Sequence, residues 1–250
     1  MSIFKKLTTD GAEKVEDRLG GFVTYPTAVY DAEIKMAYAG KSPAGALNLT
    51  IIADLDGKEY RETIYVTNKA GENTYPDRND AKKKHLMPGF ITVNDLCLLT
   101  TDIGLNEQDT EEKMVKVYNV AEKKEVPTAV QALTGLIGQK VKLGILRTKS
   151  FKQKKNDSGV YVDTTETRME NSIDKVFHAE SGRTVTEYLH EVEPGEFMPA
   201  WDAKNKGIDR DKTNSPATVG AGAGLGGSSR PGGLGGAGGS STAKKSIFNK

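Results

Sequence analysis

Aromatic and basic side chains recur together at three places along the chain. The first place holds Arg61 and Tyr65, four residues apart in a segment of alternating apolar and polar residues. The other two are polar runs with these members: Tyr75, Lys82, Lys83 and Lys84 in one, and Arg147, Lys149, Phe151 and Lys152 in the other. A flat ring stacks on a base and a cation neutralises a phosphate, each stacked base contributing roughly 1–3 kcal/mol. The combination indicates a surface for single-stranded nucleic acid.

The buried face of residues 60–67 decides whether Tyr65 is available to such a ligand. The segment alternates, so Ile64 and Val66 lie on one face of a strand and Arg61 and Tyr65 on the other. If Ile64 and Val66 face the core, Arg61 and Tyr65 project outward. The alternative is that Tyr65 packs beneath a helix, and the pattern leaves both open.

Charge is segregated along a chain whose net charge is only +1. Between residues 140 and 155 there are seven Lys or Arg and no acid, whereas residues 107–125 hold six acids. Segregation on a nearly neutral total predicts one basic groove on an otherwise mixed surface. Lys142 belongs to the basic run and joins the predicted nucleic-acid-binding residues.

No constellation typical of catalysis or metal binding stands out. His85, His178 and His190 lie far apart in the sequence, and isolated histidines are more often ordinary surface or core residues than ligands. The single cysteine, Cys97, lies in an apolar run and excludes both an intramolecular disulfide and a Cys-rich zinc site. We expect no enzymatic activity, no cofactor and no metal.

Alternating apolar residues predict several antiparallel strands. Strands at 30–38, 47–55 and 58–67, joined by short turns that include Asp56-Gly57, form a meander. The further expected elements are a long polar loop at 68–88, a helix at 93–103, a short strand at 114–118, a helix opened by Pro127 and ended by Gly138, a strand at 140–149, a basic loop at 151–159, a strand at 168–177 and a helical turn at 184–190. The order predicts a mainly β (α+β) fold, a small antiparallel barrel of five to six strands with inserted helices.

Composition divides the chain into three segments. We expect a flexible N-terminal arm at 1–21, a folded domain at 22–193 and a disordered Gly-rich tail at 194–250. The run 220–239 is mostly Gly with Ala and Ser, which loses much backbone entropy on ordering and buries little.

The tail ends in a short apolar pair with a cationic rim. Its members are Lys244, Lys245, Ile247, Phe248 and Lys250. A flexible tether with such a tip suits a docking motif that recruits a partner protein. The alternative is a chance hydrophobic pair at a disordered terminus. Residues 2–6 (SIFKK) nearly repeat the tip (SIFNK), which leaves open that both ends compete for one pocket.

The hydropathy pattern gives no sign of a membrane protein. No stretch approaches the roughly 18 consecutive apolar residues that a spanning helix needs. The N-terminal residues do not form the apolar region of a signal peptide. We therefore expect a soluble intracellular protein with no membrane partner.

The chain resembles bacteriophage single-stranded DNA-binding proteins with an oligonucleotide-binding (OB) fold, most closely those of schitoviruses of the coliphage N-four type. The resemblance rests on the meander at 30–67, the run 136–143 (LIGQKVKL) that enters the basic strand, the run 171–177 (NSIDKVF) that closes the domain, and the tail. It implies an OB-like barrel. One feature departs from the family, because most such tails end in acids and this one ends in lysines, which argues against a tail that mimics DNA.

The resemblance implies sequence-independent cover of single-stranded DNA during phage replication and recombination, in the cytoplasm of the infected bacterium. The tail would then recruit phage replication proteins or host RNA polymerase, and so serve transcription activation. An alternative is a transcription or assembly adaptor whose main ligand is protein. A third interpretation is a phage structural protein that uses the Gly-rich tail for assembly and has no affinity for nucleic acid.

Overall fold

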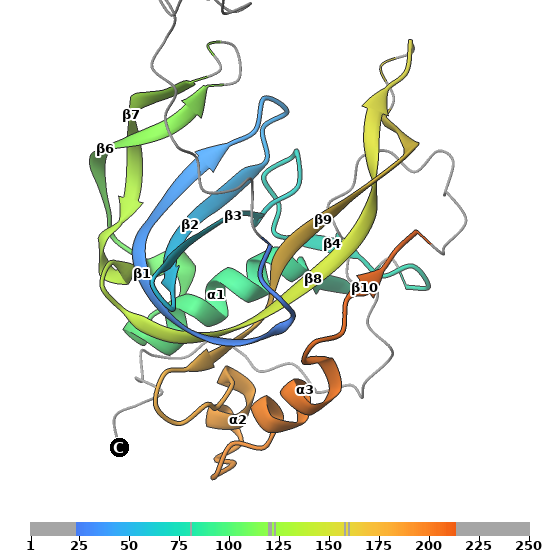
Figure 1. The fold of residues 1–250 in the computed structure, drawn as a ribbon. Helices are drawn as coiled ribbons and strands as arrows, with labels where there is room; N and C mark the ends of the chain where they lie inside the picture. Colours follow the sequence, from blue (N-terminus) through green and yellow to red (C-terminus); the bar gives the residue numbers. More distant parts are fainter. Residues whose placement is uncertain are drawn as a thin grey trace, which may run out of the picture.

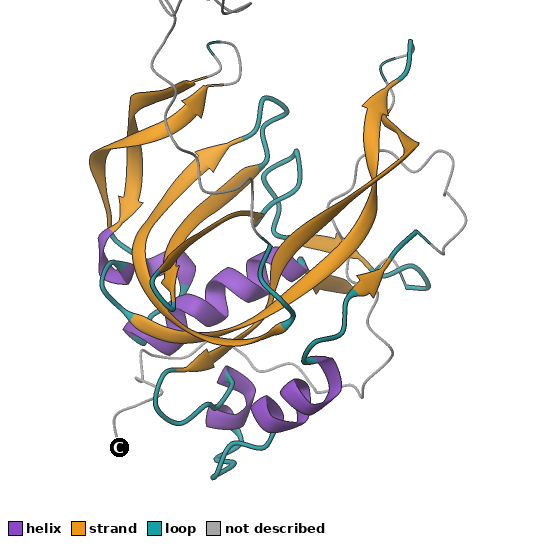
Figure 2. Cartoon of the chain, in the orientation of Figure 1, coloured by secondary structure: helices purple, strands orange, loops and turns teal. Residues whose placement is uncertain are grey.

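A strongly bent antiparallel sheet organises the computed structural model of the protein (Figure 1). The structure describes residues 24–213, apart from 81, 120, 121, 123, 158 and 160. Strands dominate this part of the chain and helices are few (Figure 2). The expected mainly β fold is therefore confirmed.

The first half of the sheet is a meander of three strands. These are β1 (Ala28–Lys41), β2 (Leu47–Leu55) and β3 (Lys58–Tyr65). Asp56 and Gly57 both adopt positive φ, 52° and 81°, as a two-residue hairpin turn requires for its twist to match that of the strands. The predicted meander and its Asp-Gly turn are confirmed.

A hairpin and a helix follow the meander. The hairpin consists of β4 (Thr74–Pro76) and β5 (Lys84–Leu86) and lies inside the segment that was expected to be a polar loop. Helix α1 (Pro88–Thr101) begins five residues earlier than predicted, because Pro88 supplies a preset φ at its first turn. A single turn, η1 (Leu105–Glu107), follows α1.

The helix expected at Pro127 is wrong, since this segment is a strand. β6 (Thr110–Asn119) and β7 (Lys124–Leu133) form a long hairpin, followed by the turn η2 (Thr134–Leu136). Burial along β7 alternates with period two, which a helix cannot satisfy. In the described residues β7 pairs with β1 only at Gln131 and Ala132. Pro127 therefore lies where β7 has no hydrogen bonds to β1, and the N–H that proline lacks is not needed there.

The basic loop expected at 151–159 is also wrong, because most of it continues a strand. β8 (Lys140–Lys155) pairs with β9 (Tyr161–His178) as far as its last residue, Lys155. Beyond the sheet the two strands run on as a twisted ribbon (Figure 1). We call residues 149–155 and 161–169 of this ribbon the arm.

Folded structure also extends past the expected domain end at residue 193. After α2 (Val185–Leu189), the segment assigned to the tail forms α3 (Phe197–Asn205) and β10 (Arg210–Asp211), which pairs with β8. Trp201 of α3 is buried against Phe177 and Leu146. Both backbone N–H groups that open α3, at Glu196 and Phe197, donate to the Glu187 carboxylate. In the sequence, the sign that this segment folds onto the domain was the single Trp201 among mostly polar residues.

The main core lies between the concave side of the sheet and α1. Val93, Leu96, Cys97 and Leu99 of α1 are buried there. A smaller apolar cluster forms where the β6–β7 hairpin covers Tyr38 and Ile52 of the sheet. Cys97 is therefore a core residue, and burial raises the pKa of its thiol to about 12.

We predict that Gly89→Ala destabilises the fold. A Cβ at Gly89 would lie 2.1 Å from the carbonyl oxygen of Tyr65, so the backbone of α1 or β3 must move. Overpacking of this kind costs about 1–3 kcal/mol, measurable as a lower urea midpoint. The matched control is Gly135→Ala, whose Cβ would meet only side-chain tips at 3.3 Å and 3.5 Å. Equal midpoints for the two variants would refute the prediction.

Candidate functional site

The sheet does not close into a complete barrel, and a cleft lies at the opening. Among the described residues, β3 pairs only with β2 and β9 only with β8. Residues 62–65 of β3 and 170–174 of β9 line opposite parts of one cleft of about 380 Å³. Residues of β8 and β10, residues 87–89 at the start of α1, and Lys212 after β10 also line the cleft. We call this opening the seam.

The Glu62 carboxylate bridges the seam. One of its oxygens accepts hydrogen bonds from the Ile173 backbone N–H and from the Tyr60 hydroxyl, both at 2.8 Å. Burial raises the pKa of Glu62 to about 7, and the two hydrogen bonds lower it only in part. A single side chain thus supplies a link between β3 and β9 that a strand ladder would otherwise make.

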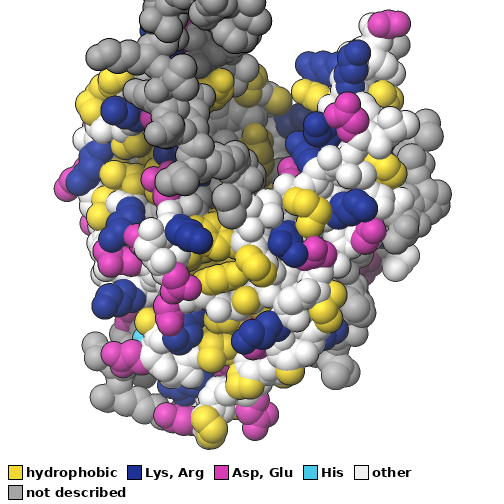
Figure 3. All heavy atoms as spheres, viewed as in Figure 1, with side chains coloured by type: hydrophobic (Ala, Val, Ile, Leu, Met, Phe, Trp, Pro, Cys, Tyr) yellow, Lys and Arg dark blue, Asp and Glu magenta, His cyan; other side chains and the backbone are white. Residues whose placement is uncertain are grey.

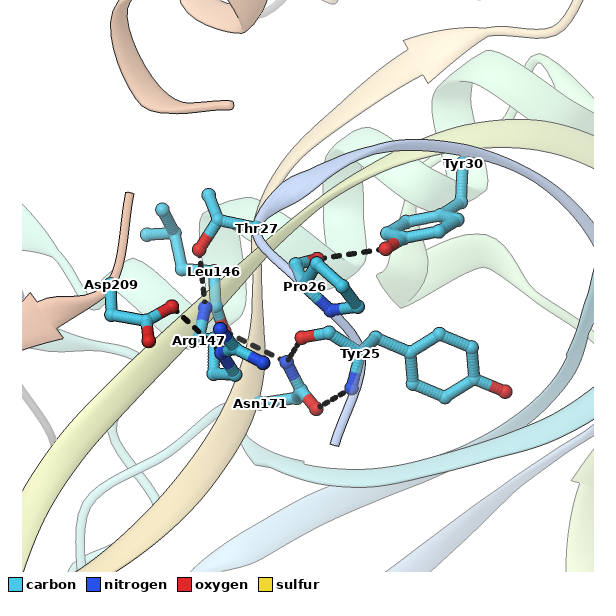
Figure 4. Close-up of polar contacts among 8 residues, drawn as sticks. All are labelled: Tyr25, Pro26, Thr27, Tyr30, Leu146, Arg147, Asn171 and Asp209. Carbon is cyan, nitrogen blue, oxygen red and sulfur yellow. Dashed lines mark hydrogen bonds and ion pairs between the residues drawn. The ribbon is translucent and has the colours of Figure 1, made fainter. Parts of the chain in front are cut away.

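The segment before β1 makes a second bridge (Figure 4). The Tyr25 N–H donates to the Asn171 side chain at 2.7 Å, and the Asn171 amide donates back to the Tyr25 carbonyl at 2.8 Å. The Tyr25 hydroxyl donates to the Lys58 carbonyl at 3.1 Å. The Tyr25 ring also packs edge-on against Tyr30 and Tyr60. Tyr25 therefore joins β9 to β3, a role that sequence reasoning missed.

The predicted faces of β3 are confirmed. Ile64 and Val66 are buried in the core, Arg61 is exposed and Tyr65 is half-buried. Tyr65 lines the cleft together with Thr148 and Ser150, at the base of the arm. Tyr65 also lies next to the first turn of α1. The alternative prediction, that Tyr65 packs beneath a helix, is therefore correct in part. Arg61 lies 3.5 Å from Glu59 on the same strand.

The predicted basic groove is more mixed in charge than the sequence suggested. Acids from elsewhere in the chain pair with three of its cations, and the pairs are Lys142–Asp31, Arg147–Asp209 at 2.7 Å and Lys152–Glu166 at 2.9 Å. The run 140–155 contains no acid, but β1, β9 and the segment before β10 bring acids to its sides. Lys142 lies at the end of β8 remote from the arm, so the structure does not bring it together with Lys149 and Phe151.

The arm carries basic and aromatic groups on both strands. Lys154 and Lys155 are exposed, and the Lys155 ammonium lies 5.3 Å from the centre of the exposed Tyr161 ring. Lys149 and Phe151 are half-buried nearer the sheet. In the space-filling view, Lys and Arg side chains gather over the arm with acidic side chains between them (Figure 3). Tyr161 was missed because its strand was expected to begin later.

The β4–β5 hairpin presents a third set of predicted residues. Tyr75 is 47% exposed and its ring lies 5.5 Å from the His85 ring. His85 bonds the Asp77 carboxylate at 2.6 Å. This bond, together with backbone N–H groups, lowers the pKa of Asp77 to about 2. The three lysines at 82–84 are exposed on the same hairpin, and Lys83 lies 3.8 Å from Asp80.

Comparison with known proteins does not assign the chain to a family. No protein-family model matches the chain, and no curated protein matches it significantly. Within residues 24–213 as described, no helix is long and apolar enough to cross a membrane, and no group of three or more His, Cys, Asp or Glu side chains could hold a metal ion. The predicted partner tip, Lys244 to Lys250, lies outside the described residues.

We predict that Glu62 makes the fold less stable as pH rises from 5 to 8. Its pKa is about 7 in the folded protein and 4.5 ordinarily, so the folded state binds a proton that the unfolded state releases. The stabilisation is complete below pH 4.5 and is lost as pH passes through 7, about 3 kcal/mol in all. Glu62→Gln keeps an acceptor oxygen and removes the charge, so its stability should not show this loss.

Urea unfolding at several pH values between 5 and 8.5 measures the difference between wild type and Glu62→Gln. Taking the difference cancels the contribution of His178, whose pKa burial lowers and which titrates in the same range. Glu59→Gln is the matched control, because Glu59 is an exposed carboxylate on the same strand. A wild-type curve parallel to that of Glu62→Gln would contradict the prediction.

Proposed function

We propose that the protein binds single-stranded DNA without sequence specificity, through an OB-like, partly open barrel. The connectivity supports the fold assignment. β1 pairs with β2 and β8, β2 with β3, and β8 with β9, while α1 lies between β3 and β8 in sequence. An OB barrel has this five-stranded arrangement and binds oligonucleotides across its second and third strands and adjacent loops.

One observation carries the proposal: the cleft joins Tyr65 on the outward face of β3 to the base of a lysine-bearing arm. A base can stack on an aromatic ring whatever its sequence, and lysines neutralise the phosphates that continue along the strand. The mixed charge of the arm is compatible with this, because exposed ion pairs are worth only about 0–1 kcal/mol and a phosphate can replace the acid. Arg61 and the β4–β5 hairpin would extend the track.

The proposal includes the biological setting that the resemblance implies. The protein would cover single strands during phage replication and recombination in the infected cell, and its C-terminal tip would recruit replication or transcription proteins. Removal of residues 244–250 should abolish partner recruitment and leave affinity for single strands unchanged. If affinity for single strands falls with the deletion, the tip belongs to the DNA site.

We predict that binding of oligo-dT to the full chain weakens steeply with salt. Fluorescence anisotropy of a labelled oligonucleotide over a salt series measures this, because each lost phosphate contact lowers the log–log slope by roughly 0.7 for single strands. The double variant Lys154→Ala/Lys155→Ala should reduce the slope. Tyr65→Ala should weaken binding by roughly 1–3 kcal/mol with little change in slope.

Lys204→Ala is the matched control, since Lys204 is an exposed lysine on α3, away from the arm. It should leave both affinity and slope unchanged. Equal affinity for duplex and single strands, or affinity that does not respond to salt, would refute the proposed function. Trp201 is buried in the α3 cluster, so tyrosine emission is the intrinsic signal to follow.

A further inference from the structure

The outer edge of the β6–β7 hairpin, formed by β6, has no partner strand in the described part of the chain. β6 spans Thr110–Asn119 and pairs with β7 over its whole length, and no other described strand pairs with it. In Figure 1 β6 lies at the left margin, on the opposite side of the molecule from the arm. A ten-residue edge offers a row of N–H and C=O groups to another strand.

The solvent-facing side of β6 carries two apolar side chains, Met114 and Tyr118, beside charged ones. Met114 is 66% exposed and Tyr118 54% exposed, whereas Val115 and Val117 on the other face pack against the small cluster around Tyr38. The hairpin therefore has one covered face and one uncovered face. Glu112 and Lys116 flank Met114 on the uncovered face, two residues away on each side.

The charge pattern of β6 is self-complementary in one antiparallel register. If Met114 lies opposite Met114 of a second copy, Glu112 of each chain faces Lys116 of the other, because residues directly opposite in this register have numbers that sum to 228. Two opposite-charge pairs then flank a Met–Met contact, each pair contributing roughly 0.2–1 kcal/mol.

The register centred on Glu112 also forms two opposite-charge pairs, Glu111 with Lys113, but it places Glu112 against Glu112. The other neighbouring registers form no opposite-charge pair. Centring the pairing on Glu112, Lys113 or Lys116 places like charges directly opposite one another, which is destabilising. Centring it on Val115 places Lys116 against Met114 and forms no ion pair. The charges of β6 thus disfavour most edge pairings and favour the one centred on Met114.

We infer that β6 is a homodimer interface, in which two copies of the chain extend one sheet across a two-fold axis at Met114. The occupant of the edge is a second copy, and the charge complementarity of Glu112 with Lys116 is the reason. Isologous pairing of this type is self-limiting, since each copy has one β6 and the pair leaves no further β6 edge. The cleft and the arm of both copies stay accessible.

Charge exchange on β6 tests the inference in the full chain. Lys116→Glu and Glu112→Lys each create two like-charge contacts in a homodimer, so each alone should shift the protein to monomer in sedimentation or light-scattering measurements at a concentration where wild type is dimeric. A mixture of the two variants restores both opposite-charge contacts and should dimerise again. The double variant Glu112→Lys/Lys116→Glu should also dimerise.

Cross-linking tests the register independently. Met114→Cys places two thiols directly opposite, within the Cα separation that a disulfide accepts, and should give a covalent dimer on mild oxidation. Tyr118→Cys lies opposite Thr110 in this register and should not. The native Cys97 is buried and does not compete. Wild type that is monomeric at high concentration, or Tyr118→Cys that cross-links as readily as Met114→Cys, would overturn the inference.

Discussion

The fold depends on how β3 and β9 are held together, since the hydrogen bonds of the sheet do not join them. The link is made by side chains: Glu62 accepts from the Ile173 N–H, and Tyr25 spans from Asn171 to the Lys58 carbonyl. A bridge made of a few side-chain bonds leaves room that a continuous ladder would fill. The cleft with Tyr65 lies where the barrel closes in this way, and it is here that the proposed DNA strand would bind.

The electrostatics of the candidate site follow from the same long-range pairing. A basic strand read alone suggests a uniform positive groove, but β8 acquires Glu166 from β9 and Asp209 from the segment before β10. These exposed pairs add little to stability, and they hold Lys152 and Arg147 in place at a low net charge. In the proposed complex, a phosphate chain with several charges would displace these acids together.

Sequence patterns predicted the local structure well where it depends on neighbours in the chain. Residues 30–67 show clear period-two alternation and an Asp-Gly turn, and they form the meander. The prediction was wrong at Pro127 because a proline before apolar residues resembles a helix start, and only the pairing of β7 with β6 makes the strand preferable. The contacts of Trp201 with Leu146, of Tyr25 with Asn171 and of Glu62 with Ile173 join segments more than 50 residues apart in sequence. The periodicity of a single sequence carries no information about such contacts. Of the candidate site, the sequence therefore predicted residue types and the outward face of β3, but neither the seam nor the acids that pair with the lysines.

Two ribbons leave the sheet in this protein, and the same physical constraint applies to both. A two-stranded hairpin is marginally stable alone, because it can bury at most one face. The β6–β7 hairpin covers Tyr38 and Ile52 with one face and is left with an unpaired edge and an apolar outer surface. Among the described residues no such cluster includes the arm, which is supported by the Lys152–Glu166 pair and by Lys155 over the Tyr161 ring. Each ribbon thus has stabilisation still to gain from a ligand, and their chemistry differs accordingly: lysines and tyrosine suit a nucleic acid strand on the arm, whereas the alternating charges around Met114 suit a second β6.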